Sequence, residues 1–232
     1  DVMLAELSPG TAVAGVFTRS ATRAASVLDC QEKIGLKMTQ GAAIIVNSGN
    51  ANAFTGKQGN LAVNDITTAV SKHLSIPKNR VFSSSTGVIG EPLPQEKITQ
   101  CIGNLTANLD TSSISEAAQA IMTTDTYPKG AFSNIQTEDG PIILAGIAKG
   151  SGMIAPNMAT MLVYLFTDAQ IEQSALQGLL SEVNATTFNA ITVDSDTSTS
   201  DTVLLAATGA SRIRVTEKSN AFRQGLHQVM LD

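Results

Sequence analysis

The feature that most constrains this chain is the apolar run at residues 161–166, Met-Leu-Val-Tyr-Leu-Phe. A run this short, rich in branched and aromatic residues, predicts a buried strand. Ala159 and Thr160 stand directly before it, and a glycine-rich stretch, residues 149–156, lies just upstream. A small residue followed by a hydroxyl-bearing residue at the start of a buried strand predicts a chain that cleaves itself between Ala159 and Thr160.

Composition indicates a compact globular protein. The chain has 232 residues, enough for one large domain or two small ones, and 43% are hydrophobic while 15% are charged. That balance excludes intrinsic disorder. Aromatic residues make up 4% and tryptophan is absent from the sequence. The core must therefore be built from Ala, Val, Ile, Leu and Met.

Several classes of function are disfavoured. The net charge is −5 without a basic stripe, so we expect no nucleic-acid partner. Apolar runs are too short to span a membrane and no signal segment is visible. The expected location is the cytoplasm, or the mitochondrial matrix if the source is fungal or another eukaryote. Cys30 and Cys101 lack metal spacing and are expected to be reduced. His73 and His227 fall in helical patterns, which makes a Ser-His-Asp enzyme hard to build.

Periodicity predicts mixed helices and strands without a strict βαβ rhythm. Strands are expected at residues 2–7, 11–17, 42–46, 80–82, 161–166, 190–193 and 202–206, with a hairpin of 130–137 and 141–148 around Asp139-Gly140. Helices are expected around Val63 to Leu74, around Ile98 to Leu109, from a capping box at 113–116, at 168–183, and at the end with Phe222, Leu226, Val229 and Met230 inward. The predicted fold class is a layered α/β (α+β) sandwich with largely antiparallel sheets. The last helix has no stop signal, so we expect the natural protein to continue.

Five small polar segments are candidate sites because loops on a rigid scaffold carry function. They are residues 47–56, 83–90, 122–129, 149–160 and 194–201. The last is dense in oxygen ligands and could hold a hard cation, but it does not match the EF-hand pattern. We predict neither a metal nor a bound cofactor.

Thr160 needs a base to act as a nucleophile, and no histidine is available from the sequence context. Cleavage before Thr160 would supply an amino group with an ordinary pKa of about 7.7–8.0. The hydroxyl would first attack the Ala159 carbonyl, giving an ester that water hydrolyses. The alternative is that Thr160 simply begins a strand.

Other candidates each have a plain alternative. Thr86, with a backbone N–H beside Gly87, would serve as an oxyanion hole, or residues 83–90 form a turn. Thr123 and Thr124 would bind a polar substrate, or they end a helix. Lys149 would pair with a substrate carboxylate, or it is solvated.

Five segments together resemble the ornithine acetyltransferase family, also called glutamate N-acetyltransferase. They are Asn47-Ser-Gly-Asn-Ala-Asn-Ala-Phe-Thr-Gly56, Ser85-Thr-Gly-Val-Ile-Gly90, Ile121-Met-Thr-Thr-Asp-Thr126, residues 148–162 (Ala-Lys-Gly-Ser-Gly-Met-Ile-Ala-Pro-Asn-Met-Ala-Thr-Met-Leu) and residues 192–203 (Thr-Val-Asp-Ser-Asp-Thr-Ser-Thr-Ser-Asp-Thr-Val). Their order and content match along nearly the whole chain.

The resemblance implies self-cleavage at Ala159–Thr160, with Thr160 as the nucleophile and with Thr86 and Gly87 as the oxyanion hole. It implies substrate contacts from Thr123 or Thr124, Lys149 and Thr160. The family moves an acetyl group from N2-acetyl-L-ornithine to L-glutamate through an acetyl-threonine enzyme in arginine biosynthesis, and some members also accept acetyl-CoA. Ping-pong kinetics follow from such an intermediate.

The resemblance also implies an αββα sandwich similar to the N-terminal-nucleophile-like aminopeptidases. Residues 1–159 would form one segment and 160–232 the start of a second, together making one main domain. The processed segments stay together and assemble into a homo-oligomer of processed heterodimers. Family members carry further substrate-binding residues, an acidic residue and an Asn–Thr pair, in a longer C-terminal region without a counterpart here. Two other readings stay open: a related self-processing amidase or aminopeptidase that hands the acyl group to water, and a non-enzymatic binding domain.

Overall fold

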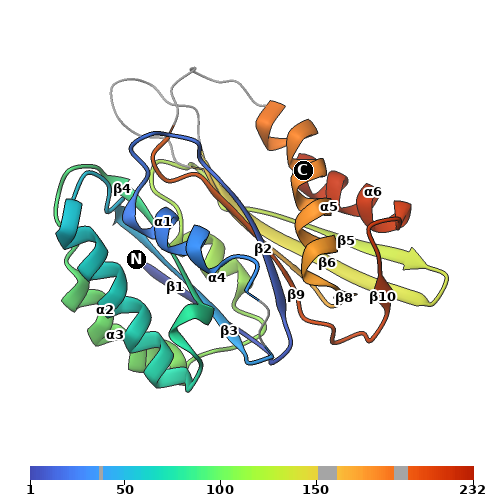
Figure 1. Ribbon diagram of the computed structural model, residues 1–232, viewed down its shortest axis with the longest axis horizontal. Helices are drawn as coiled ribbons and strands as arrows, with labels where there is room; N and C mark the ends of the chain where they lie inside the picture. The colour runs from blue at the N-terminus through green and yellow to red at the C-terminus, as the bar shows by residue number, and fades with distance from the viewer. Residues whose placement is uncertain (37–38, 151–160, 191–197) are drawn as a thin grey trace.

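The computed structural model describes residues 1–36, 39–150, 161–190 and 198–232. Four layers stack in the order helices, sheet, sheet, helices (Figure 1). The expected αββα sandwich is therefore confirmed. In the described part of the chain, no helix is both long enough and apolar enough to cross a bilayer.

The first sheet has three strands in the order β1 (Val2–Leu7), β3 (Ala42–Asn50), β4 (Val81–Val88). β1 is antiparallel to β3, and β3 is parallel to β4. A short 3-10 turn, Lys78–Arg80, leads into β4. Helices α2 (Gly56–Leu74) and α3 (Gln95–Ala107) cover its outer face, where Ile66 and Ile102 belong to the same buried cluster as Ile45.

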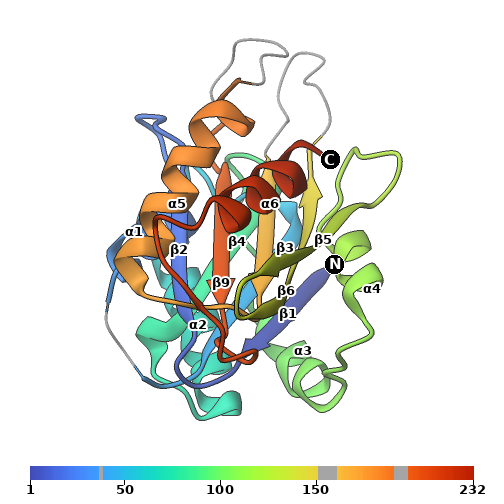
Figure 2. The ribbon, with the colours of Figure 1, turned by 90° about the vertical axis from the view of Figure 1, so that its right-hand side faces the viewer.

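The second sheet has five strands in the order β2 (Ala12–Phe17), β9 (Thr202–Ala207), β7 (Leu162–Thr167), β6 (Gly140–Lys149), β5 (Lys129–Thr137). Within the described residues, β7 and β9 pair in parallel and the other neighbouring strands of this sheet pair antiparallel. Helices α5 (Gln173–Thr186) and α6 (Asn220–Leu231) cover its outer face (Figure 2). Two short parallel strands, β8 (Gln170–Ile171) and β10 (Arg214–Val215), and a 3-10 turn, Phe188–Ala190, complete this side.

Strand β7 contains most of the apolar run at residues 161–166. Leu162 and Tyr164 belong to the buried cluster between the two sheets. Val163 and Leu165 belong instead to the cluster under α5 and α6. Because successive side chains of a strand point to opposite faces, a strand between two apolar layers must be apolar at every position.

Two further helices close the sides of the sandwich. Helix α1 (Ala25–Lys33) packs beside β4 and α2, and helix α4 (Ile114–Ala120) packs beside β1 and the β5–β6 hairpin. The end of α4 is tied to the first sheet, because the Ser48 hydroxyl of β3 donates to the Ala120 carbonyl at 2.8 Å. This contact places the segment after α4 next to the end of β3.

Most of the predicted elements are confirmed, but two polar segments are not loops throughout. Residues 47–50 continue β3 and residues 83–88 continue β4, so the turn expected at 83–90 is wrong. The two polar stretches pair with each other in parallel, Ser48 with Thr86 and Gly49 with Gly87. Their backbone hydrogen bonds are thereby satisfied within the sheet, which the polarity of the side chains does not reveal.

Two helix starts also differ from expectation. Ser113 precedes α4, but its side chain makes no capping hydrogen bond, since its backbone (φ −81°, ψ 20°) is not extended as a capping residue requires. The helix expected at 168–183 begins at Gln173, where the Glu172 side chain accepts from the Ser174 amide. The strand expected at 190–193 lies outside the described residues apart from Ala190, which ends a 3-10 turn.

Candidate active site

The candidate site lies at one edge of the sandwich. Strands β3, β4 and β6 end there and β7 begins there (Figures 1 and 2). The β6–β7 ladder closes with Lys149 opposite Leu162, and the β3–β4 ladder closes near Gly49 and Gly87. Ala159 and Thr160 lie outside the described residues, but Gly150 and Met161 on either side of 151–160 are both at this edge.

Lys149 is the most unusual charged residue at this edge. Its side chain is 3% exposed, so the alternative of a solvated lysine is wrong. It leaves β6 on the same face as Ile147, which belongs to the cluster between the sheets. Its Nζ donates to the Thr123 hydroxyl at 3.0 Å. Burial lowers the pKa of Lys149 to about 8, although the carboxylates of Asp125 and Asp201 act in the opposite direction.

Asp125 organises the segment that follows α4. Its side chain is 1% exposed, and one carboxylate oxygen accepts from Lys129 Nζ at 2.6 Å and from the Gly150 amide at 2.8 Å. The other oxygen accepts from the Thr123 amide at 3.4 Å. Burial works to raise the pKa of Asp125, but these hydrogen bonds hold the pKa below its usual value. Thr123 and Lys149 are therefore fixed against each other by a carboxylate that stays charged.

Asp201 precedes β9 and reaches the start of β7. Its Oδ1 accepts from the Met161 amide at 2.9 Å. Burial raises the pKa of Asp201, against the hydrogen bonds from Met161 and Ser198 and the charge of Lys149. The carboxylate therefore holds the backbone at the residue that follows Thr160 in sequence.

Thr86 and Gly87 stand at the end of β4. Thr86 is 1% exposed and shares a strand face with Phe82, which lies between the sheets. Tyr164 of β7 belongs to the same cluster, and its burial there raises the pKa of its hydroxyl. Thr86 thus faces the same interlayer space as Lys149, from the opposite sheet.

Gly87 is required by geometry. Its φ of +132° is one that side chains rarely adopt, and a Cβ there would lie 2.2 Å from the Gly49 carbonyl carbon. From the sequence, Gly87 is expected beside a backbone N–H of an oxyanion hole. The structure gives a further reason, which is the close approach of β3 to β4.

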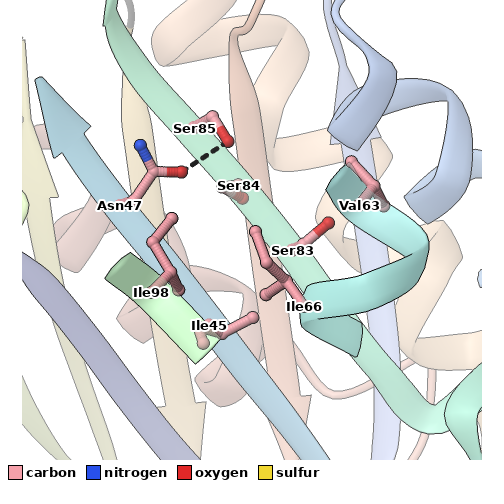
Figure 3. A pocket seen from close by; sticks show the side chains of 8 residues that line it. All are labelled: Ile45, Asn47, Val63, Ile66, Ser83, Ser84, Ser85 and Ile98. Carbon is pink, nitrogen blue, oxygen red and sulfur yellow. Dashed lines mark hydrogen bonds between the residues drawn. The ribbon is translucent and has the colours of Figure 1, made fainter. Parts of the chain in front are cut away.

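A small cavity of about 10 Å³ lies on the other face of the first sheet (Figure 3). Ser83 and Ser85 of β4 line it with Asn47, and Ser85 Oγ donates to Asn47 Oδ1 at 2.7 Å. A volume of this size holds about one water molecule. It is too small for an amino-acid substrate, and it faces α2 and α3 instead of Lys149.

The remaining candidates are placed as follows. Thr123 and Thr124 are both exposed, and Thr123 touches Lys149. His73 and His227 lie on α2 and α6, in the outer helical layers, and Cys30 and Cys101 are unpaired. Residues 194–197 of the oxygen-rich segment lie outside the described residues. Among the residues that are described, no cluster of His, Cys, Asp or Glu could hold a metal ion.

Comparison with known proteins decides the family. The model of the ArgJ family matches residues 1–232, the whole of the chain. The chain belongs to the ArgJ family. The resemblance to the ornithine acetyltransferases found in its motifs is thereby confirmed.

Curated relatives support the ArgJ assignment. The arginine biosynthesis bifunctional protein ArgJ of Ruegeria pomeroyi is 59% identical over 232 residues, which are 100% of this chain and 57% of that protein. The corresponding protein of Gluconobacter oxydans is 50% identical over 209 residues, covering 90% of this chain and 49% of that protein. This ArgJ-family chain spans about half the length of the curated relatives it matches.

Solved structures of ArgJ-family proteins are also similar to this chain. ArgJ from Bacillus halodurans has a TM-score of 0.54 and 28% identity, over 69% of this chain and 98% of that chain. Ornithine acetyltransferase from Mycobacterium tuberculosis, solved in complex with ornithine, has a TM-score of 0.54 and 29% identity, over 68% and 99%. A Burkholderia sp. beta-aminopeptidase, 11% identical with a TM-score of 0.53 over 99% of this chain and 72% of that chain, shares the fold.

Two residues of this candidate site were not predicted from the sequence. Asp201 was placed only in a possible cation loop, and Asp125 was named only beside its threonines. Their partners are backbone amides, 40 and 25 residues away along the chain respectively. Residue type and local spacing carry no signal for contacts of that kind.

Proposed function

We propose that the protein transfers an acetyl group from N2-acetyl-L-ornithine to L-glutamate in arginine biosynthesis, with acetyl-CoA as a second candidate donor. The observation that carries the proposal is the buried Lys149, held against Thr123 at the edge where the chain leads into Thr160. Both amino-acid substrates carry a carboxylate, and a buried ammonium group beside a hydroxyl is suited to bind one. Membership of the ArgJ family supports the same assignment.

The reaction begins with self-cleavage. The Thr160 hydroxyl attacks the Ala159 carbonyl, and the peptide nitrogen leaves as the new α-amine of Thr160. Water then hydrolyses the ester, leaving Ala159 with a carboxylate and Thr160 with a free hydroxyl. The α-amine can now accept the hydroxyl proton, which makes the threonine a nucleophile near neutral pH.

Acetyl transfer uses the same atoms. Thr160 Oγ attacks the acetyl carbonyl of acetylornithine, the C–N bond breaks, and ornithine leaves after its amine takes up a proton. The amine of glutamate then attacks the acetyl-threonine ester, and acetylglutamate leaves as the Thr160 hydroxyl re-forms. Thr86 and the backbone N–H beside Gly87 would stabilise the oxyanion of each tetrahedral intermediate. Thr123, Thr124 and Lys149 would orient the substrates.

Residues 1–159 and 160–232 would then be the segments on either side of the cut. The lengths of the solved relatives support this division, because 69% of 232 residues is about 160 residues, and that share covers 98% of the Bacillus halodurans chain. We further propose that the processed segments assemble as a homo-oligomer of heterodimers in the cytoplasm.

The test is a transfer assay with the full-length protein. Acetylornithine is supplied with and without glutamate, and acetylglutamate, ornithine and acetate are quantified. The proposal predicts acetylglutamate and ornithine in equal amounts when glutamate is present, and little acetate. Release of acetate at the same rate with or without glutamate would instead establish an amidase.

Thr160→Ala and Thr160→Ser are the matched variants. The alanine variant should stay uncut and inactive, since it lacks the attacking hydroxyl. The serine variant keeps a hydroxyl and should still be processed. Splitting of Thr160→Ala between residues 159 and 160 would refute the mechanism.

A further inference from the structure

Two carboxylates hold the chain at the two sides of residues 151–160. Asp125 accepts from the Gly150 amide at 2.8 Å, directly after β6. Asp201 accepts from the Met161 amide at 2.9 Å, directly before β7. Both amides lie just beyond the last β6–β7 pair, Lys149 with Leu162.

Asp201 is itself anchored from a different direction. Its backbone carbonyl accepts from the Thr18 amide at 2.9 Å, and the next amide, Thr202 N, donates to the Met161 carbonyl at 3.0 Å. Thr18 also donates through its hydroxyl to Ser198 O at 2.6 Å. Asp201 therefore bonds the N–H of Met161, and the next residue, Thr202, bonds its C=O. Asp201 is in turn hydrogen-bonded to Thr18, which directly follows β2.

From this geometry we infer that Asp201 is a positioning residue, which fixes the peptide directly after Thr160 so that the nucleophile keeps its place once the preceding bond is cut. This inference rests on the proposed role of Thr160. After cleavage, Thr160 would be a chain end with one covalent neighbour, Met161, and its orientation would depend on how firmly that neighbour is held. A misplacement of about 1 Å can cost about a hundredfold in rate.

Asp125 has a different task in the same site. It holds Gly150 and the Thr123 amide, and Thr123 contacts Lys149. Loss of Asp125 should therefore disturb substrate binding, whereas loss of Asp201 should disturb the chemical steps. The two aspartates predict opposite kinetic signatures.

The chain offers a matched control for Asp201. Asp168 lies at the opposite end of β7, and its Oδ1 accepts from the Ile143 amide of β6 at 2.8 Å. Asp168→Ala removes the same kind of carboxylate-to-backbone hydrogen bond at the other end of β7, where the partner strand is β6 instead of β9. Both aspartates are half-buried.

The first measurement is independent of activity. Amide hydrogen exchange is followed at Met161 and Ile143 in uncut Thr160→Ala protein that carries Asp201→Ala, Asp168→Ala or neither change. Asp201→Ala should speed exchange at Met161 about tenfold or more and leave Ile143 unchanged, and Asp168→Ala should do the reverse. Unchanged protection of Met161 in Asp201→Ala would overturn the inference, even if acetyl transfer were confirmed.

The second measurement is kinetic. In protein with an intact Thr160, Asp201→Ala should slow self-cleavage and lower kcat by about 10- to 100-fold, with KM for acetylornithine within about twofold. Asp201→Asn keeps an oxygen that accepts from Met161 N and should recover to within about fivefold. Asp125→Ala should mainly raise KM, and Asp168→Ala should change neither constant more than about twofold.

Two kinetic outcomes would contradict the inference. Equal losses of kcat in Asp201→Ala and Asp168→Ala would show that Asp201 only stabilises the fold. An Asp201→Asn variant as slow as Asp201→Ala would refute the role of Asp201 as a hydrogen-bond acceptor.

Discussion

At the scale of single residues, Lys149 combines burial with a charge. A buried ammonium group is costly unless it is paired, and here its neighbours are the Thr123 hydroxyl and two carboxylates. Burial dominates, so the pKa of Lys149 falls from 10.5 to about 8. The charge that would bind a substrate carboxylate is therefore present below pH 8 and lost above it.

This shift predicts how substrate binding depends on pH. If only charged Lys149 binds the carboxylate of acetylornithine, KM should rise roughly fivefold between about pH 8 and pH 9. In Lys149→Met, KM should be higher at every pH and lack this alkaline rise. Steady-state kinetics from pH 6 to pH 10 measure both. An identical alkaline rise in the variant would show that another group causes it.

Gly87 carries the second prediction at this scale. Gly87→Ala adds a Cβ that would lie 2.2 Å from the backbone of β3, at a φ of +132°. Neither problem can be relieved by a flexible side chain, so we expect the free energy of unfolding to fall by at least about 2 kcal/mol. Gly178→Ala on α5 is the control, because its Cβ would meet no atom within 4 Å. There a gain of about 0.5–1 kcal/mol is expected from helix propensity. Urea unfolding of both variants measures these changes in the free energy of unfolding.

At the scale of elements, helix α5 protects an edge of the five-stranded sheet. β2 lies at that edge, and two glutamines one helical turn apart pair with its backbone. Gln173 bonds both the N–H and the C=O of Val13 (3.1 and 2.8 Å), and Gln177 bonds both groups of Gly15 (3.0 Å each). The two side chains act as a substitute for a neighbouring strand, which blocks edge-to-edge association.

Removal of these side chains should expose the edge. Gln173→Ala with Gln177→Ala should lower the free energy of unfolding by about 1–3 kcal/mol and increase concentration-dependent association. Gln228→Ala on α6 removes an exposed contact with Asp232 and should change stability by less than about 0.5 kcal/mol. Unfolding curves and light scattering would measure both effects. Equal behaviour of the two proteins would refute the protective role.

Some helices and strands can be predicted from the sequence better than others. The run at 161–166 and the inward residues of the last helix were predicted correctly, because burial on known faces imposes a periodicity. The polar ends of β3 and β4 were not predicted as strands. Each of them pairs with the other, across 38 residues of sequence in the pair Ser48 and Thr86, and both are polar. For the site, the sequence motifs selected Lys149 and Thr123, which the structure brings together. The supporting carboxylates were missed because a hydrogen bond to a backbone amide leaves no trace in the partner's residue type.

At the scale of the whole molecule, the five-stranded sheet joins the two proposed segments. In the order β2-β9-β7-β6-β5, the second segment supplies β9 and β7, and the first supplies the strands on both sides. Both junctions between segments, β2 with β9 and β6 with β7, are antiparallel ladders of six residue pairs. A cut before Thr160 would therefore leave the sheet intact.

The interleaved sheet predicts that the processed segments remain together. After cleavage they should elute as one species in gel filtration and separate only in denaturant. Their unfolding should be one cooperative transition, because both share the core between the sheets. Separation of the segments in native buffer would contradict this architecture.

The most direct test of the account is the intact mass of the full-length protein after brief exposure to acetylornithine without glutamate. We predict two polypeptides, of which the one that begins at Thr160 gains a single acetyl group and loses it when glutamate is added. An uncut chain, or an acetyl group that stays on when glutamate is supplied, would contradict the claim that Thr160 carries the acetyl group between substrates.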